Sequence, residues 1–260
     1  MTVKKNFMYN FDVMIELKRV PPNLGVRHEY QKKLDGLVQA MSKSVLYWVL
    51  ADYGNRTARE MALEIQKRIK QWKKVFGKES SKIALWFVNS IKRHTENGMR
   101  ESFRKAGIKK FNGISKNDAL MVEYENISLI NSIPEKYFTG VETVALLALG
   151  YGWTKADLTD ELVHRYNIAS RRVKLIARDQ TQKATELFKR SICFNMGIRK
   201  GKWVYTYRSE KPRESHVEMN GAIYDLEKGC YDYYENEYIH PAQKINCQCD
   251  FVPIIEEPWD

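Results

Sequence analysis

The sequence predicts an α+β fold that is mostly α, with an N-terminal helical bundle followed by a C-terminal domain of helices and a small β unit. Two observations support this prediction. Up to about residue 194, apolar side chains recur at the three- and four-residue spacing of amphipathic helices. From Trp203 to Val252 the pattern changes to short extended runs, turns and sulfur, and this stretch holds three of the four cysteines.

The composition fits a soluble globular protein. The chain has 260 residues, of which 43% are hydrophobic and 29% charged. No apolar run approaches the roughly 20 residues that span a bilayer, and Met1 to Arg19 lacks the apolar core of a signal peptide. A membrane partner is therefore not expected. We expect a reducing compartment, so disulfides are not the first explanation of the cysteines.

The positive charge is concentrated in the N-terminal part. Residues 1–113 hold 24 Lys and Arg against 10 Asp and Glu, whereas the rest of the chain holds 19 against 22. One interpretation is an ordinary solvated helical surface. The other is a face that contacts nucleic acid, where counterion release favours binding, or an acidic protein.

The segment up to Gly25 is expected to be irregular, and three helices follow it. Their predicted ranges are 28–53, 57–76 and 80–106, with Gly77 and Gly107 as C-terminal stops. Their apolar stripes should pack against one another, and the aromatic residues, His28 and His94 are assigned to packing or surface. The candidate DNA-binding residues surround the second stripe: Lys67, Arg68, Lys70, Lys73 and Lys74.

Low apolar content near Gly113 places a boundary there. The predicted domains are a basic helical region over 1–113 and a second domain over 114–260. In the second domain we expect helices within 117–196, over 117–131, 134–150, 155–166 and 170–194. Thr154 and Ser170 are the expected N-caps of the last two.

A small β and turn unit is predicted for residues 203–255. Lys202 to Arg208 has the aromatic and β-branched content of a strand. Pro212 begins a short helical turn that Gly221 ends. Cys249 to Ile255 is apolar but contains Pro253, which predicts an edge strand.

Cys247 and Cys249 are two residues apart, so in an extended chain both thiols point the same way. Together with His216 and either His240 or Cys230, they would complete a tetrahedral site for a structural zinc. Two alternatives remain open. The cysteines are ordinary packing residues with His216 bonded to a turn, or they form a catalytic Cys–His pair.

Two other groups of side chains stand out. Arg178, Asp179, Gln180 and Lys183 form a polar cluster on a helix otherwise built for packing. This cluster either pairs internally, Asp179 with Lys183 one turn on, or bonds the C-terminal unit onto the helix. The tyrosines of residues 231–238 alternate with acidic residues, which favours a protein interface or a solvated loop over phosphate contact.

The order of these elements resembles the phage Mu F-like head morphogenesis family over roughly residues 117–255. The resemblance rests on Ser132 to Phe138, Leu175 to Lys183, and a succession of spaced residues after them. These are Trp203, Arg213, His216, Asn220, Gly221, Pro241, Asn246, Cys247 and Cys249.

Two departures from the family pattern weaken the case for an acid-dependent reaction more than they weaken the family resemblance. Relatives often have Pro-Gly-Glu where this chain has Pro241, Ala242 and Gln243. They also often carry an acidic residue at the place of Arg208, Ser209 and Glu210.

The resemblance implies a minor head protein of the virion, present in few copies near the portal vertex inside the head. Before assembly such a protein is in the host cytoplasm. Its implied partners are the portal protein and the major capsid or scaffold protein, with phage DNA through the basic helices. Its implied role is head morphogenesis and genome packaging or delivery, without enzymatic activity. The alternative is a zinc-dependent hydrolase or nuclease built on His216, His240 and the C-terminal cysteines.

Overall fold

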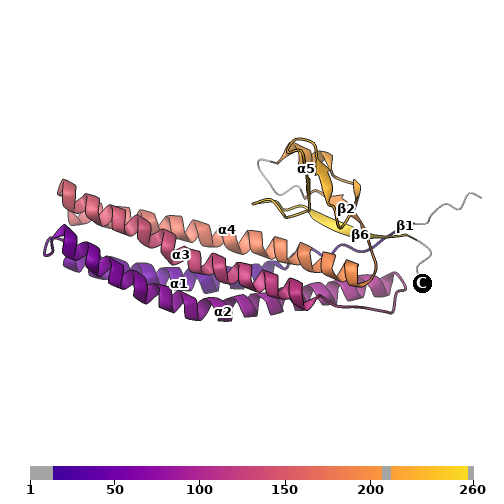
Figure 1. Cartoon of the computed structure of the whole chain (residues 1–260), viewed down its shortest axis with the longest axis horizontal. Helices are drawn as coiled ribbons and strands as arrows, with labels where there is room; N and C mark the ends of the chain where they lie inside the picture. The colour runs from indigo at the N-terminus through magenta and orange to yellow at the C-terminus, as the bar shows by residue number, and fades with distance from the viewer. Residues whose placement is uncertain (1–13, 207–211, 257–260) are drawn as a thin grey trace, which may run out of the picture.

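A computed structural model describes residues 14–206 and 212–256. Four long helices lie side by side as an elongated bundle: α1 (Leu24–Asp52), α2 (Ala58–Lys105), α3 (Lys116–Tyr151) and α4 (Lys155–Asn195). A small β unit sits on α4 near its C-terminal end (Figure 1). The predicted class, α+β and mostly α, is confirmed.

Side-chain caps fix where the helices begin. Asn23 accepts a hydrogen bond from the backbone of Val26, so α1 starts before the predicted residue 28. Thr57 and Thr154 form reciprocal capping boxes at the starts of α2 and α4. Ser115 caps α3. The loop between α2 and α3 contains the boundary predicted near residue 113.

The predicted stop at Gly77 was wrong, because the two helices expected on either side of it form one continuous helix, α2. Phe76 and Ser80 lie on either side of Gly77 and are both fully buried. A glycine inside a helix costs about 1 kcal/mol relative to alanine. Burying one phenylalanine contributes about 1.5–3 kcal/mol, so the packing outweighs the glycine.

Residues 114–195 also form fewer and longer helices than predicted. Pro134 lies inside α3 instead of beginning a new helix, and the flanking Ile130 and Tyr137 are buried. Likewise, α4 runs without a break through Ser170. The Ser170 hydroxyl lies 3.4 Å from the Asp35 carboxylate of α1, so it does not cap a helix.

The bundle has one hydrophobic core with polar side chains inside it. Tyr30 of α1 stacks on Phe87 of α2, with ring centroids 4.3 Å apart. Its hydroxyl donates to the buried Asn126 of α3, which in turn donates to Gln180 of α4. A single chain of contacts therefore connects all four helices.

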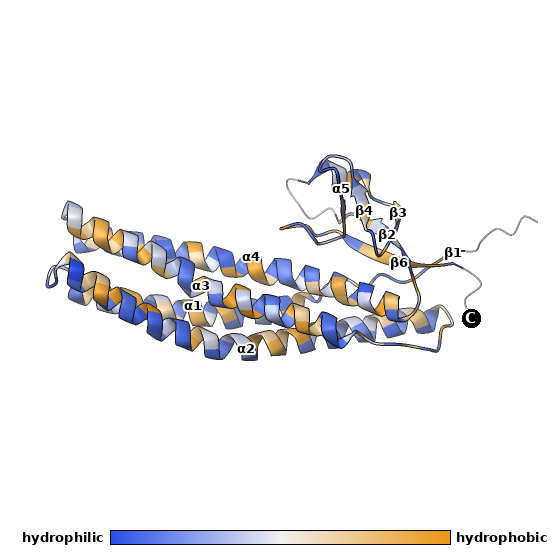
Figure 2. Ribbon diagram, in the orientation of Figure 1, coloured by the Kyte–Doolittle hydropathy of each residue, from blue (hydrophilic) through white to orange (hydrophobic). Residues whose placement is uncertain are grey.

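Hydrophobic and hydrophilic residues alternate around the long helices (Figure 2), as amphipathic packing requires. Among the described residues, no helix has the length and apolar character needed to cross a membrane.

The sheet joins the two ends of the chain. The strands are β1 (Met14–Glu16), β2 (Lys200–Val204), β3 (Ile223–Asp225), β4 (Cys230–Asp232), β5 (Glu237–Ile239) and β6 (Asp250–Glu256). The main sheet is antiparallel with the order β1-β6-β2-β3, and β4 and β5 form a separate hairpin. The short helix α5 (Glu214–Glu218) forms the turn predicted after Pro212.

Two predictions for this sheet were wrong, and a third strand has other bounds than predicted. The segment expected to be irregular contains β1, and β1 pairs with β6, so β6 is an inner strand and not an edge. Strand β2 begins at Lys200 and ends at Val204, and the end predicted at Arg208 lies outside the described residues, as do Ser209 and Glu210. Pro253 is tolerated because its carbonyl, which accepts from Leu17, faces the end of β1. Its missing N–H therefore removes only the last bond of that ladder.

A buried cluster of charges fastens the β unit to the bundle. The amine of Lys189 on α4 is fully buried and pairs with Asp250 of β6 and, at 2.9 Å, with Glu186. It also donates to the carbonyl of Phe251 at 2.9 Å. Arg19, next to β1, pairs with the other oxygen of Asp250. Although burial opposes the charge, Asp250 and Glu186 raise the pKa of Lys189, so the lysine is held protonated.

Replacing Lys189 with methionine should destabilise the protein by about 3–5 kcal/mol, because Glu186 would lose its cation and the buried Asp250 would keep only Arg19. Urea unfolding followed by circular dichroism measures the change. The control, Lys174→Met, removes an exposed lysine from the same helix and should change stability by less than about 0.5 kcal/mol. A similar small change for Lys189→Met would contradict the assigned role.

Candidate metal centre

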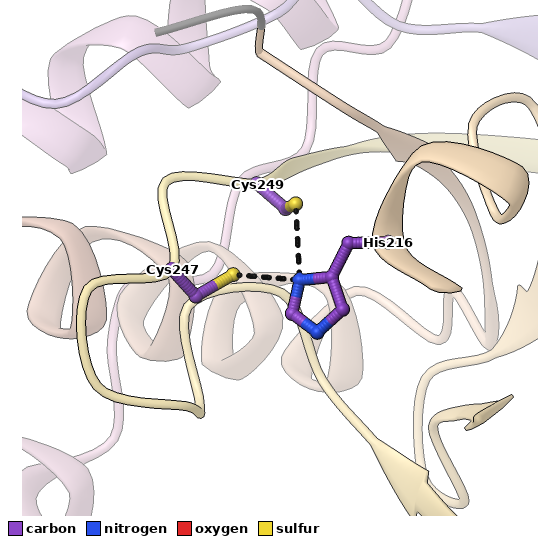
Figure 3. A group of neighbouring side chains, drawn as sticks. All are labelled: His216, Cys247 and Cys249. Carbon is purple, nitrogen blue, oxygen red and sulfur yellow. Dashed lines mark hydrogen bonds between the residues drawn. The ribbon is translucent and has the colours of Figure 1, made fainter. Parts of the chain in front are cut away.

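Three side chains from separate parts of the small unit meet in its interior (Figure 3). His216 lies on α5, Cys247 lies in the loop after β5, and Cys249 immediately precedes β6. Their exposed fractions are 3%, 4% and 2%. The sequence placed these residues in one candidate site, and the structure brings all three together.

The imidazole lies between the two thiols. Nδ1 of His216 is 3.4 Å from Sγ of Cys247 and 3.5 Å from Sγ of Cys249. All three candidate ligand atoms lie within 4.8 Å of one another. A tetrahedral zinc would hold a sulfur and a nitrogen ligand roughly 3.6 Å apart, given Zn–S near 2.3 Å and Zn–N near 2.05 Å. The donor types and spacings therefore fit zinc.

The two cysteines differ strongly in acidity. Hydrogen bonding from Cys249, and from His216, lowers the pKa of Cys247 to about 4 against the effect of burial. The bond to Cys247 and burial raise the pKa of Cys249. One thiolate is thus already favoured at neutral pH, which is the form that binds metal.

The other two predicted ligands are not in this group. His240 lines a cavity between α4 and β3, and Cys230 begins the β4–β5 hairpin. Within residues 14–206 and 212–256, the metal-ligand group contains only His216, Cys247 and Cys249.

Packing and hydrogen bonds position the imidazole of His216. The indole of Trp203 on β2 is fully buried and meets the ring edge-on, with centroids 5.4 Å apart. The neighbouring Ser215 donates to the buried Asp232 of β4 at 3.0 Å, which anchors α5. Nε2 of His216 is buried and has no hydrogen-bond partner in the described part of the chain.

Side chains of α4 hold the loop that carries the cysteines. Asp179 accepts from the backbone of Asn246 at 3.0 Å, and Arg178 donates to the Asn246 side chain. Gln182 donates to the carbonyl of Cys249 at 3.0 Å. Asn246 itself has a φ of 64°, a conformation that asparagine tolerates better than most residues.

Both interpretations of the polar cluster therefore describe contacts that are present. Lys183 pairs with Asp179 at 3.2 Å, and the second oxygen of Asp179 bonds the small unit. Gln180 has a different role, since it donates to Glu125 of α3 and accepts from Asn126.

The remaining motif residues organise the small unit itself. Arg213 donates to the carbonyl of Ile245 at 3.1 Å, and Asn220 accepts from the backbone of Tyr205 at 2.9 Å. Gly221 has a φ of 88°, which favours glycine, and its N–H donates to Trp203.

The candidate DNA-binding residues differ in their pairing. Lys67 and Arg68 both contact Glu64, and Lys73 contacts Glu135. Lys70 and Lys74 are exposed and make no ion pair with any residue that the structure describes. These two lysines are the most available for an anionic partner.

Sequence reasoning missed Gln182, Ser215 and the charged cluster around Lys189. Glutamine, serine and lysine are residue types that mostly lie on the surface. The one available signal is that Lys189 lies between Thr185, Phe188 and Ile192, which continue the apolar face of α4.

The arrangement favours metal binding or a buried thiolate over a reaction on a large substrate. The thiols and the imidazole are almost fully buried. The short contacts run from Nδ1 of His216 to the two sulfurs and not to the surface. Three ligands of a four-coordinate zinc leave one position open, as in catalytic zinc sites. The depth of the cluster restricts access to that position.

Comparison with known proteins supports one family. The family model described as "Phage Mu protein F like protein" matches residues 139–252. That segment runs from within α3 to β6 and includes α4, α5 and all three clustered ligands. No curated protein and no solved structure matches the chain.

Zinc binding remains a prediction. Protein purified in reducing, chelator-free buffer should carry about one equivalent of zinc by elemental analysis. Replacing Cys247 and Cys249 with serine should remove the metal and loosen residues 203–252, because a metal contributes directly to the stability of a small unit. Hydrogen exchange should show the four long helices still protected.

Two matched variants serve as controls for the zinc measurement. Cys230→Ser and His240→Ala should keep the full equivalent, since neither residue belongs to the cluster. Protein without stoichiometric metal would leave the two thiols as packing residues.

Proposed function

We propose that this chain is a minor phage head protein near the portal vertex inside the head, because residues 139–252 match the family model described as "Phage Mu protein F like protein". There it acts in head morphogenesis and in packaging or delivery of the genome. The proposed partners are the portal protein and the major capsid or scaffold protein. The family match is the observation that carries this proposal.

The geometry supports a structural component better than an enzyme. The residues shared with the family pattern mostly fasten one element to another: Asp179 to the Asn246 loop, Arg213 to Ile245, and Asn220 to Tyr205. The zinc-dependent hydrolase would need an accessible ligand position, whereas His216, Cys247 and Cys249 are 2–4% exposed.

Purified virions should contain the protein in a small number of copies relative to the major capsid protein. Quantitative mass spectrometry of particles measures the ratio, and an asymmetric cryo-EM reconstruction locates the chain relative to the portal. Detection in infected-cell lysate but never in particles would refute the proposal.

We also propose that phage DNA contacts the basic helices, mainly through Lys70 and Lys74. The bundle includes α1 and α2 in one core with α3 and α4, so the test uses the full chain. Lys70→Glu with Lys74→Glu should weaken duplex binding for all sequences. The slope of log affinity against log salt should fall by roughly 2, one unit for each lost phosphate contact.

A matched pair separates this contact from the effect of net charge. Lys109→Glu with Lys110→Glu makes the same charge change in the exposed loop between α2 and α3, and it should have a smaller effect. If both double variants lose the same affinity for duplex DNA, or if the unaltered chain does not bind duplex at low salt, the DNA contact is refuted. The basic surface would then be a solvated surface or one that contacts protein.

A further inference from the structure

A cavity of about 410 Å³ lies where the small unit meets the bundle. Glu125 of α3 together with Glu186 and Arg190 of α4 line one side. Tyr224 of β3 and the loop from His240 to Gln243 line the other. Its volume falls within the range of small-molecule sites, roughly 300–1,000 Å³.

Three polar atoms of the lining are buried and unsatisfied. They are Oε1 of Glu186, the hydroxyl of Tyr224 and Nδ1 of His240, and none has a hydrogen-bond partner among the described residues. Glu186 and Tyr224 are only 5% and 7% exposed. Each unsatisfied buried group costs about 1–3 kcal/mol, so three around one cavity require an explanation.

The cavity also holds a cation without a directly bonded counterion. Arg190 forms no ion pair or hydrogen bond with another described residue, although Glu186 lies one turn away on the same helix. Burial lowers the pKa of Arg190, although Tyr224, Asp118 and Glu186 lie near enough to oppose that shift in part. Its charge is therefore poorly solvated, and an anion in the cavity would stabilise it.

The other charged groups of the lining have bonded partners, although the partner of Glu125 is a neutral amide and only Lys183 has an opposite charge beside it. Glu125 accepts from Gln180 at 2.9 Å, and Lys183 pairs with Asp179 at 3.2 Å. Because Lys183 is paired with Asp179, Arg190 is the cation of the lining that is available to a ligand.

Two of the groups with an unsatisfied atom, Glu186 and His240, favour their neutral forms, although Oε2 of Glu186 is already bonded to Lys189 and to the backbone of Phe251. Burial and the nearby Asp250 raise the pKa of Glu186 well above its usual value, which favours its protonated, hydrogen-bond-donating form. Burial lowers the pKa of His240 to about 4, so its imidazole is neutral and has one N–H to donate. The free groups are thus one cation and three neutral potential donors.

We propose that this cavity binds a small molecule through an oxyanion group, either a carboxylate or a phosphate. The guanidinium of Arg190 is the planar, charged donor that binds such groups in two-point fashion. Tyr224, Glu186 and His240 complete the hydrogen bonds around the anion. Water alone would satisfy the polar atoms but would leave the Arg190 charge without a directly bonded counterion.

The proposal is tested by titrating the full chain with inorganic phosphate and, separately, with citrate. Isothermal calorimetry is performed at constant ionic strength set with chloride. At least one of the two anions should bind saturably with one site per chain, and the anion that binds identifies the group recognised. If neither saturates, or if chloride at equal ionic strength gives the same heats, the proposal is overturned.

Three variants localise the binding. Arg190→Gln should abolish it, whereas Arg171→Gln, which removes an exposed arginine from the same helix, should leave it unchanged. Tyr224→Phe should weaken it by about tenfold, the effect of one hydrogen bond to a charged group. Equal affinity in Arg190→Gln and the unaltered chain would overturn the assignment.

Stability of the unliganded protein gives a readout that does not depend on binding. Tyr224→Phe should not lower the melting temperature without ligand, because the removed hydroxyl has no partner there. A marked fall in melting temperature would show that the hydroxyl is satisfied within the protein, and this would overturn the proposal.

Discussion

The buried pair of Lys189 and Asp250 connects the two parts of this molecule, and much else depends on it. It joins α4 to β6 where both side chains are fully removed from solvent. Removing two charges from water costs several kcal/mol for each ion, and only close pairing with further hydrogen bonds offsets that cost. Here Glu186, Arg19 and the carbonyl of Phe251 supply them.

This pairing also fixes the position of the metal-ligand cluster. Asp250 directly follows Cys249, and Gln182, two turns before Lys189 on α4, holds the Cys249 carbonyl. Helix α4 therefore fixes the position of the Cys249 thiol, because Gln182 bonds the Cys249 carbonyl and Lys189 bonds the next residue, Asp250. Loop residues 246–248 then bring Cys247 to the same imidazole. A rigid helix thus positions a site whose ligands come from loops and a short helix.

The helical part of the fold was predictable from the sequence because a 3.6-residue period persists over many turns. The helix breaks predicted at Gly77 and Pro134 are absent. Each of these residues destabilises a helix locally, and the burial of neighbours such as Phe76 and Tyr137 outweighs that cost. Strand β1 has three residues, too few to show an alternating pattern. Its pairing with β6 depends on a contact between residues more than 230 positions apart, which local propensity does not encode.

The candidate site was predictable in part for a related reason. The spacing of Cys247 and Cys249 places two thiols together, and His216 follows from the family resemblance. The distance of His240 from them depends on how the loop after β5 folds, and nothing local to His240 indicates it. Lys189 was missed because lysine is ordinarily a surface residue.

The pairing of β1 with β6 has a consequence for synthesis on the ribosome. Glu256, the partner of Met14, is translated about 240 residues after it. At roughly 5–20 residues per second, this strand waits from about ten to fifty seconds before its hydrogen-bonding edge is covered. All four long helices are translated within that interval, before the last strand of the sheet. Strand β1 is therefore made before the four long helices, yet its hydrogen-bonding edge is covered only after all of them have been translated.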